Sequence, residues 1–424
     1  RKDNIMAQSL TNYDSVLKDF YEGVVRETLN QNVTAFRVLD ESDKSWSGRR
    51  VNFPFRTARN SGVGARAEGG TLPSAGQQGY QLCQITASYQ YCTMKISGPV
   101  LQAGKHAFAD AMQSEMEGCT NDLINDLGRQ AWGDSTGRIA MVSHSATAAG
   151  CTAIGVKNRF DTPGFHGARY ISTSQLIDGG TTASPTADFS SATVSKVVIS
   201  ENASTTFDEI QASAGGLSGV SAGNFIFNRG AGGIEMMGLR GLIDNFSATN
   251  VYSSTGYAGS SVQGINRGSV SEFNSIVLGN SSVERVVTPQ LLQKAFDRIA
   301  TNSGLEPNLI WGHHDTIRAV LEGVTHDRRY NSPDFAVGHT ALSFNGIPIE
   351  RDRHAPHNEL YILDRSVIKL YTLSDFAFAS RDGSILSRSS NEDAYEAYLR
   401  AYKQIAFDGS PKGACVIRDI KVDF

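Results

Sequence analysis

Two groups of histidines in this chain have the residue types and spacing that metal chemistry uses. His313 and His314 precede Asp315, and His354 and His357 form an H-x-x-H spacing between two acidic residues. Imidazole and carboxylate groups are common zinc ligands, so a metal-dependent enzyme is one hypothesis. The run RDRHAPHNE around the second pair, however, holds a proline and both charge signs, which is typical of a surface loop. We therefore expect a loop at His354 and His357, a helix cap at His313 and His314, and no metal site.

Other signatures of catalysis are missing from the sequence. It contains no G-x-S-x-G nucleophile elbow, no G-x-x-x-x-G-K-[ST] phosphate loop and no H-E-x-x-H. The five cysteines are far apart and never in a C-x-x-C spacing, which favours thiols over a disulfide framework or zinc site. They are Cys83, Cys92, Cys119, Cys151 and Cys415. We therefore predict no enzyme, no catalytic residue and no cofactor.

Composition favours a soluble globular protein of two or three domains. The chain has 424 residues, of which 40% are hydrophobic and 19% charged, and its formal net charge is -4. A negative chain is a poor nucleic-acid binder as a whole, because affinity for DNA depends on phosphate neutralisation by Lys and Arg. No apolar run approaches 18 residues and no secretory h-region follows the start, so we expect no membrane span and synthesis in the cytoplasm.

An amphipathic helix is predicted over residues 105–132. Six residues spaced three or four apart form one stripe of a 3.6-residue period. They are Phe108, Met112, Met116, Cys119, Leu123 and Leu127. Gly118 lies near the middle and costs about 1 kcal/mol relative to alanine, so tertiary packing must stabilise the helix there.

A long hairpin is predicted just before this helix. RRVNFPFR and QLCQITASYQYCTMKIS are rich in β-formers, and the Gly-rich segment between them contains almost nothing that could fill a core. We predict a β-hairpin over residues 49–98 with a long tip. A segment of this length usually becomes ordered against another surface.

Charge separates between the hairpin and the helix. Residues 44–67 contain six basic side chains and no acidic one, whereas residues 107–127 contain five acidic side chains and no basic one. Such segments can be complementary between neighbouring copies, where charge sets orientation more than affinity, although both can also be merely solvated faces. The predicted contact residues are Arg49, Arg50, Arg56, Arg59 and Arg66 in the hairpin, and Asp110, Glu115, Glu117, Asp122 and Asp126 in the helix. Lys44 is the sixth basic residue of the segment.

The remaining chain is read as mixed α and β structure. We predict an N-terminal helix over 9–30, mostly strands over 139–285, and a helix that begins with Thr288 and Pro289 and ends at Gly304. NLIWG is a buried strand, HDTIRAVLEGV a short helix, and KGACVIRDIKV a final strand, whereas DAYEAYLRAYKQIAF is either helical or extended.

This succession of parts resembles the major capsid proteins of tailed bacteriophages, the Hong Kong 97 type of fold. The likeness covers most of the chain and rests on the order of the parts, with FNGIPIERDRHAPHNELYILD as its most family-like block. It implies an α+β fold with a peripheral domain, an axial domain, an extended loop and an N-terminal arm. The implied limits are 1–48 for the arm, 49–98 for the extended loop, 99–165 and 376–424 for the peripheral domain with spine helix 105–132, and 166–375 for the axial domain with a possible inserted β-rich segment at about 184–270.

The resemblance also implies a structural function. Hexamers and pentamers of the chain would form an icosahedral shell, assembled in the host bacterial cytoplasm, that encloses double-stranded DNA in the virion with only weak, non-specific contact. Portal, scaffold and decoration or cement proteins are the implied partners. Because residues 51–94 contain no Lys, the Lys–Asn cross-link that some members form from this loop is not expected.

Three alternatives remain open from the sequence. An encapsulin nanocompartment would use the same fold to hold enzymes instead of a genome. A phage tail or adhesin protein would also be rich in Gly, Ser and Thr, but it should show repeats or a coiled coil, and neither is visible. A metal-dependent enzyme would require an ion on His354 and His357.

Overall fold

A computed structural model of the chain shows an α+β architecture with two compact units. Unit 1 consists of residues 1–42, 87–129 and 370–404, and unit 2 of residues 43–86, 130–369 and 405–424. None of the described helices combines the length and apolar character needed to cross a membrane. The structure describes residues 28, 32–97, 105–143, 152–160, 167–199, 208–212, 216–217, 219–245, 261–325, 343–379, 387–388 and 392–422.

Unit 1 is built on a four-stranded sheet whose central strand is β19 (Ala394–Phe407). This segment, for which the sequence left helix and strand open, is a strand because its side chains alternate between a buried face and a more exposed one. Its buried face includes Lys403, which pairs with Asp375 at 2.8 Å. The neighbours of β19 are β3 (Ser88–Ser97), β17 (Ile368–Phe378) and β18 (Ser387–Arg388).

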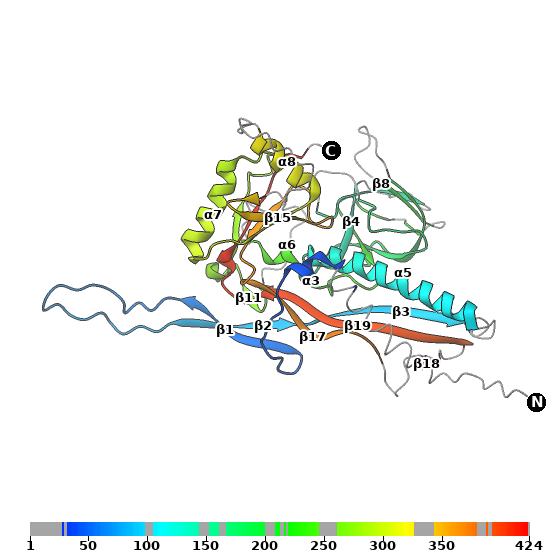
Figure 1. Cartoon of the computed structure of the whole chain (residues 1–424), viewed down its shortest axis with the longest axis horizontal. Helices are drawn as coiled ribbons and strands as arrows, with labels where there is room; N and C mark the ends of the chain where they lie inside the picture. The colour runs from blue at the N-terminus through cyan, green and yellow to red at the C-terminus, as the bar shows by residue number, and fades with distance from the viewer. Residues whose placement is uncertain are drawn as a thin grey trace, which may run out of the picture. The chain divides into compact units, whose positions relative to one another are not determined.

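The predicted amphipathic helix is present as α5 (Lys105–Ala131) (Figure 1). The short helix α3 (Thr34–Val38) also belongs to unit 1. Met116, Leu123 and Leu127 of the predicted stripe are buried, which confirms this part of the stripe. Cys119 of α5 forms a disulfide with Cys92 of β3, so the expectation of thiols alone was wrong for this pair. Two cysteines 27 positions apart gave no pattern in the sequence, because only the packing of the helix on the sheet brings them together.

The predicted hairpin belongs to unit 2 and is shorter than predicted. Strands β1 (Arg50–Ala58) and β2 (Gly79–Thr86) pair antiparallel, from Arg50 opposite Thr86 to Ala58 opposite Gly79. The return run does not continue along β1 beyond Thr86, because its second half is β3, which pairs with β19 in unit 1. At the base, the Phe55 ring contacts the Phe273 ring at 5.0 Å, and Gln84 donates its backbone N–H to the Gln263 carbonyl oxygen.

A closed six-stranded barrel forms the β-rich middle of unit 2. Its strand order is β4-β5-β8-β7-β6-β9, and apolar side chains such as Val156, Ile177, Ile210 and Ile226 fill it. Three of its strands, β7, β8 and β9, come from the segment 184–270. The bounds are β4 (Arg138–Val142), β5 (Ala153–Lys157), β6 (Leu176–Gly180), β7 (Phe189–Val198), β8 (Asp208–Ala212) and β9 (Phe225–Asn228).

A six-stranded sheet with two helices forms the other core of unit 2. Its strand order is β12-β20-β16-β13-β15-β14. Helix α7 (Pro289–Ser303) has every predicted feature: Thr288 accepts the Leu291 N–H, Pro289 opens the helix, and Gly304 closes it with φ 72°. The strands are β12 (Ile276–Leu278), β13 (Leu309–Gly312), β14 (Ser343–Phe344), β15 (Ile347–Arg351), β16 (Leu360–Leu363) and β20 (Ala414–Ile417), and the second helix is α8 (His314–Thr325).

Short elements complete unit 2. They are α6 (Leu239–Leu242), β10 (Ser261–Val262), β11 (Ile265–Asn266), and the 3-10 turns η3 (Ser271–Phe273) and η4 (Pro411–Gly413). Apart from Thr28, the predicted helix at 9–30 lies outside the described residues, as does Cys151.

Candidate functional site

The basic side chains of the hairpin are exposed. Arg56 lies at the distal end of β1, and Arg59 and Arg66 lie in the tip. Arg50 donates to the Gln84 side chain across the hairpin at 3.1 Å, and Arg66 donates to the Thr71 carbonyl within the tip. The tip also exposes apolar side chains, with Leu72 at 82% and Val63 at 65%. An exposed ribbon with cationic and apolar side chains is suited to binding another surface.

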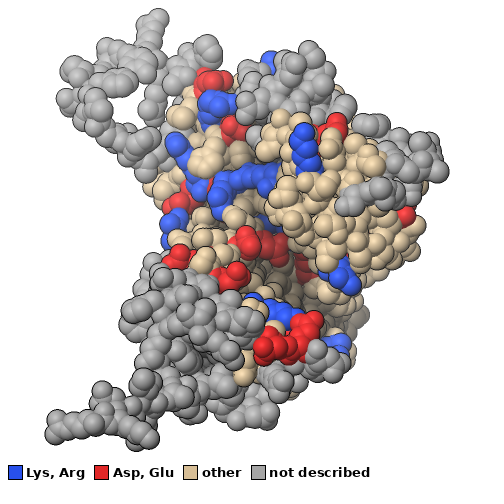
Figure 2. All heavy atoms as spheres, turned by 90° about the vertical axis from the view of Figure 1, so that its right-hand side faces the viewer, with Lys and Arg blue, Asp and Glu red and all other residues tan. Residues whose placement is uncertain are grey.

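The acidic side chains of the predicted helix differ in their exposure. Glu115, Glu117 and Asp122 are exposed, whereas Asp126 pairs with Arg129 at 2.6 Å within α5. The side chain of Asp110 lies outside the described residues. On the face drawn in Figure 2, basic and acidic side chains are interspersed, and neither sign covers it alone.

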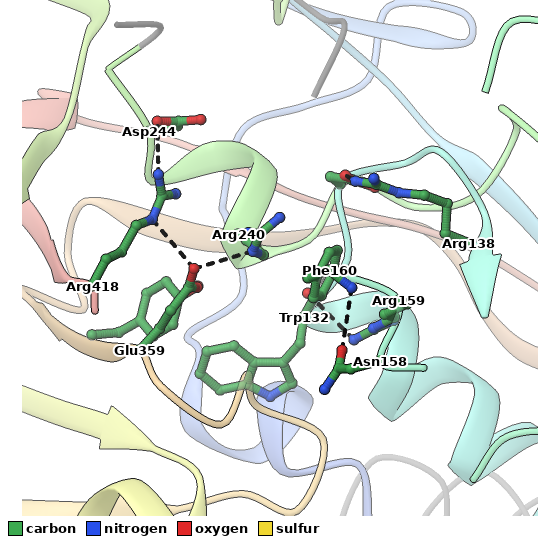
Figure 3. A network of polar contacts seen from close by, with 11 residues as sticks. Trp132, Arg138, Asn158, Arg159, Phe160, Arg240, Asp244, Glu359 and Arg418 are labelled. Atoms are coloured by element: carbon green, nitrogen blue, oxygen red, sulfur yellow. Dashed lines mark hydrogen bonds and ion pairs between the residues drawn. The ribbon is translucent and has the colours of Figure 1, made fainter. Parts of the chain in front are cut away.

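A buried ionic core lies in unit 2, where the sequence had indicated a surface loop (Figure 3). Glu359, directly before β16, is fully buried, and one of its carboxylate oxygens lies 3.3 Å from Nε of both Arg240 and Arg418. Tyr361 donates its hydroxyl to the other carboxylate oxygen. Burial alone would raise the pKa of Glu359, but Arg240 and Arg418 outweigh it and hold the pKa below its ordinary value.

Aromatic rings enclose this core. The Arg240 guanidinium lies 4.0 Å from the centre of the Phe160 ring, a cation–π contact in a desolvated setting. Trp132, which follows α5, contacts Tyr361 and Trp311 edge to face and donates its indole N–H to Asp352 at 2.9 Å. Tight packing and charge pairing together fix the positions of α6, β13 and β16.

A second buried pair extends the core towards the barrel. Arg138, the first residue of β4, forms a charge-assisted hydrogen bond with Asp134, and its guanidinium lies 4.8 Å from the Phe225 ring centre. Burial would raise the pKa of Asp134, but Arg138 and the Thr136 hydroxyl reverse this and lower it. This arrangement holds charges in place and presents no activated nucleophile or acid–base pair, so we interpret it as structural.

The histidines are grouped differently from their spacing in the sequence. The 352–359 segment is largely buried, and the surface-loop prediction was wrong because the carboxylates of Asp352 and Glu359 have hydrogen-bond partners in the interior. His354 stacks on Tyr170 and contacts its hydroxyl at 3.0 Å. His357 instead lies beside His313, which is distant from it in the sequence.

The predicted helix cap is present at His313. Its Nδ1 accepts the Asp315 N–H at 3.2 Å in the first turn of α8. His314, in contrast, is exposed.

Sequence reasoning missed the core arginines. Arg138, Arg159, Arg240 and Arg418 are isolated in the sequence and belong to no motif. The local sequence gives one signal, which is that these arginines have apolar neighbours. Arg240 lies in GLRGL and Arg418 follows two apolar residues in VIRDI. Such a position is consistent with a buried, paired arginine.

Comparison with known proteins gives a match at the level of structure. No model of a known protein family and no curated protein matches the sequence. A chain of the cyanophage A-1(L) capsid superimposes with a TM-score of 0.53 at 11% identity, covering 90% of each chain. The chain has the Hong Kong 97 type of capsid fold.

Two further structures are similar at lower scores. The SrpI encapsulin of Synechococcus elongatus PCC 7942 matches with a TM-score of 0.43 at 8% identity over 92% of this chain and 89% of its own. The capsid of an empty gene transfer agent particle matches with a TM-score of 0.47 at 7% identity over 92% and 90%. The fold assignment rests on the cyanophage capsid chain, which covers 90% of this chain.

Proposed function

We propose that this chain is a shell subunit, the major capsid protein of a tailed phage, which assembles as hexamers and pentamers around double-stranded DNA. The observation that carries the proposal is the exposed hairpin β1–β2 on a chain that shares its fold with a phage capsid protein over 90% of its length. A ribbon whose tip exposes Leu72, Val63 and two arginines has too little core of its own, and a second copy of the chain is its natural partner.

In this proposal the parts have the roles that the resemblance implies. The hairpin would be the extended loop that lies on a neighbouring copy, α5 the spine helix of the peripheral domain, and the sheet with α7 and α8 the core of the axial domain. Arg56 and Arg59 would meet acidic side chains of the neighbour such as Glu115 and Asp122. Portal, scaffold and decoration proteins would be further partners, and the virion the location.

The test is assembly with and without the hairpin charges. Negative-stain electron microscopy and sedimentation velocity in low and high salt should show closed shells or capsomers for the natural sequence. The double variant Arg56→Glu/Arg59→Glu should remain a folded subunit and assemble poorly. A matched control, Lys196→Glu/Arg229→Glu, makes the same charge change at two exposed positions of the barrel and should assemble normally.

The outcomes separate the candidate functions. A discrete monomer or dimer of the natural sequence in all salts would contradict the shell proposal. Normal shells from the hairpin variant would remove the electrostatic account of docking but retain the shell. The encapsulin alternative, favoured by the resemblance rather than by a particular residue, is decided by cargo: nuclease-protected DNA indicates a virus, and an enclosed protein indicates a nanocompartment.

A further inference from the structure

Three potential metal ligands converge in unit 2, and they are not the pair that the H-x-x-H spacing suggested. His313 precedes α8, Asp315 lies in its first turn, and His357 comes from the segment before β16. One donor atom from each residue lies within 4.8 Å of the other two. The His313 and His357 rings are 3.9 Å apart between centroids, and both rings are buried.

The donor geometry suits a divalent ion. Oδ2 of Asp315 lies 3.1 Å from Nδ1 of His313 and 3.0 Å from Nδ1 of His357. For bonds of about 2.1 Å, neighbouring donors around an ion are roughly 3.0 to 3.4 Å apart, so both oxygen–nitrogen spacings already fit. An ion would take the lone pair of His313 Nδ1 that now accepts the Asp315 N–H, and the proton of His357 would move from Nδ1 to Nε2. The other carboxylate oxygen contacts Arg318 at 3.5 Å, which leaves Oδ2 directed at the histidines.

The protonation states are also suitable. Burial and the neighbouring His357 lower the pKa of His313 to about 3, so its ring is neutral at physiological pH. The hydrogen bond from His357 lowers the pKa of Asp315 to about 2, so its carboxylate is ionised. A neutral imidazole and an ionised carboxylate are the forms that bind metal. His357 also lines a pocket with Tyr170 and His354.

We propose that His313, Asp315 and His357 bind a divalent transition-metal ion, Zn²⁺ in the first instance, that links the start of α8 to the segment before β16. Two nitrogens and one oxygen favour Zn²⁺, Co²⁺ or Ni²⁺ over Ca²⁺ or Mg²⁺. Water completes the coordination. The positive charges of Arg318 and of Arg169, which also lowers the pKa of His313, weaken affinity, so we expect moderate binding.

Cobalt is the probe for the test. The purified full-length chain, freed of metal with a chelator, is titrated with Co²⁺ while visible absorption is recorded, and Zn²⁺ is then added in competition. We expect a ligand-field band that Zn²⁺ abolishes, and a Tm that rises with Zn²⁺ and returns with chelator. Absence of both the band and the Tm shift in the natural sequence would overturn the proposal.

Variants locate the site. Asp315→Asn keeps the side-chain shape and should weaken binding by more than about 100-fold, beyond the usual effect of an outer-shell change. His357→Asn is a second ligand variant should the first fail to fold by circular dichroism. The control His314→Ala removes an exposed histidine next to the cluster and should bind as the natural sequence does. The assignment would be overturned if the ligand variants bound the metal as tightly as the natural sequence does, or if the control lost metal binding.

Discussion

The hairpin and the buried ionic core use the same residue type in opposite environments. Arg56, Arg59 and Arg66 are exposed on a ribbon, whereas Arg240 and Arg418 are 8% and 3% exposed and share one carboxylate. In water a pair of charges contributes little to stability and is screened by salt, so the exposed arginines can act mainly through orientation and association. Inside the protein the same charge must be paired, and removal of its partner is strongly destabilising.

Removal of the central carboxylate should have the largest effect. Glu359→Gln would leave Arg240 and Arg418 without their shared anion, and we expect a loss of about 3 to 5 kcal/mol of unfolding free energy. Urea denaturation followed by circular dichroism measures it. Glu306→Gln, a change of the same kind at an exposed position, is the control and should be nearly neutral. A small loss of unfolding free energy in Glu359→Gln would mean that the core tolerates an unpaired arginine. The contrast between the buried and the exposed arginines would then not hold.

Removal of the disulfide of unit 1 should have the next largest effect on stability. Cys92 and Cys119 lie 27 positions apart, and for a loop of this length the chain-entropy model gives about 3.5 kcal/mol. We expect Cys92→Ser/Cys119→Ser to lower the Tm of the oxidised protein, with no difference from the natural sequence under reductant. Thiol labelling with mass spectrometry checks the bond directly. Free thiols at both Cys92 and Cys119 in the oxidised protein would show that packing alone holds α5 on the sheet.

Acid should destabilise the buried core through Glu359. Because the pKa of Glu359 is lowered in the folded protein, its contribution is present above its ordinary value of 4.5 and is lost as pH falls through the folded pKa. The slope is at most about 1.4 kcal/mol per pH unit for this group. Unfolding free energies from pH 7 to 3 should converge for the natural sequence and Glu359→Gln only below 4.5. Convergence between pH 7 and 5 would contradict the pairing.

The hairpin arginines should have the smallest effect on the subunit. We expect Arg56→Glu/Arg59→Glu to change unfolding free energy by less than about 0.5 kcal/mol, because both side chains are exposed. The check is denaturation of the dissociated subunit, next to the assembly assay described above. A large destabilisation would mean that these residues support the hairpin itself and would remove the distinction between the two regions.

The amino-acid sequence by itself determined the local elements and their order. Thr288, Pro289 and Gly304 specify α7, and the spacing of Met116, Leu123 and Leu127 specifies the buried stripe of α5. These signals act between residues a few positions apart, through caps and helical periodicity, so they can be read without the fold. The succession of such elements was also sufficient to predict the Hong Kong 97 type of fold.

Only the tertiary structure decided which distant side chains meet. Arg240 and Glu359 are 119 positions apart, Asp244 and Arg418 are 174 apart, and His357 finds His313 and Asp315 instead of His354. Strand β3 likewise pairs with β19 instead of extending the hairpin, and its partner residues lie some 300 positions further along the chain. Burial and pairing are long-range properties, and a charged residue in the sequence does not show whether it will face water or a partner.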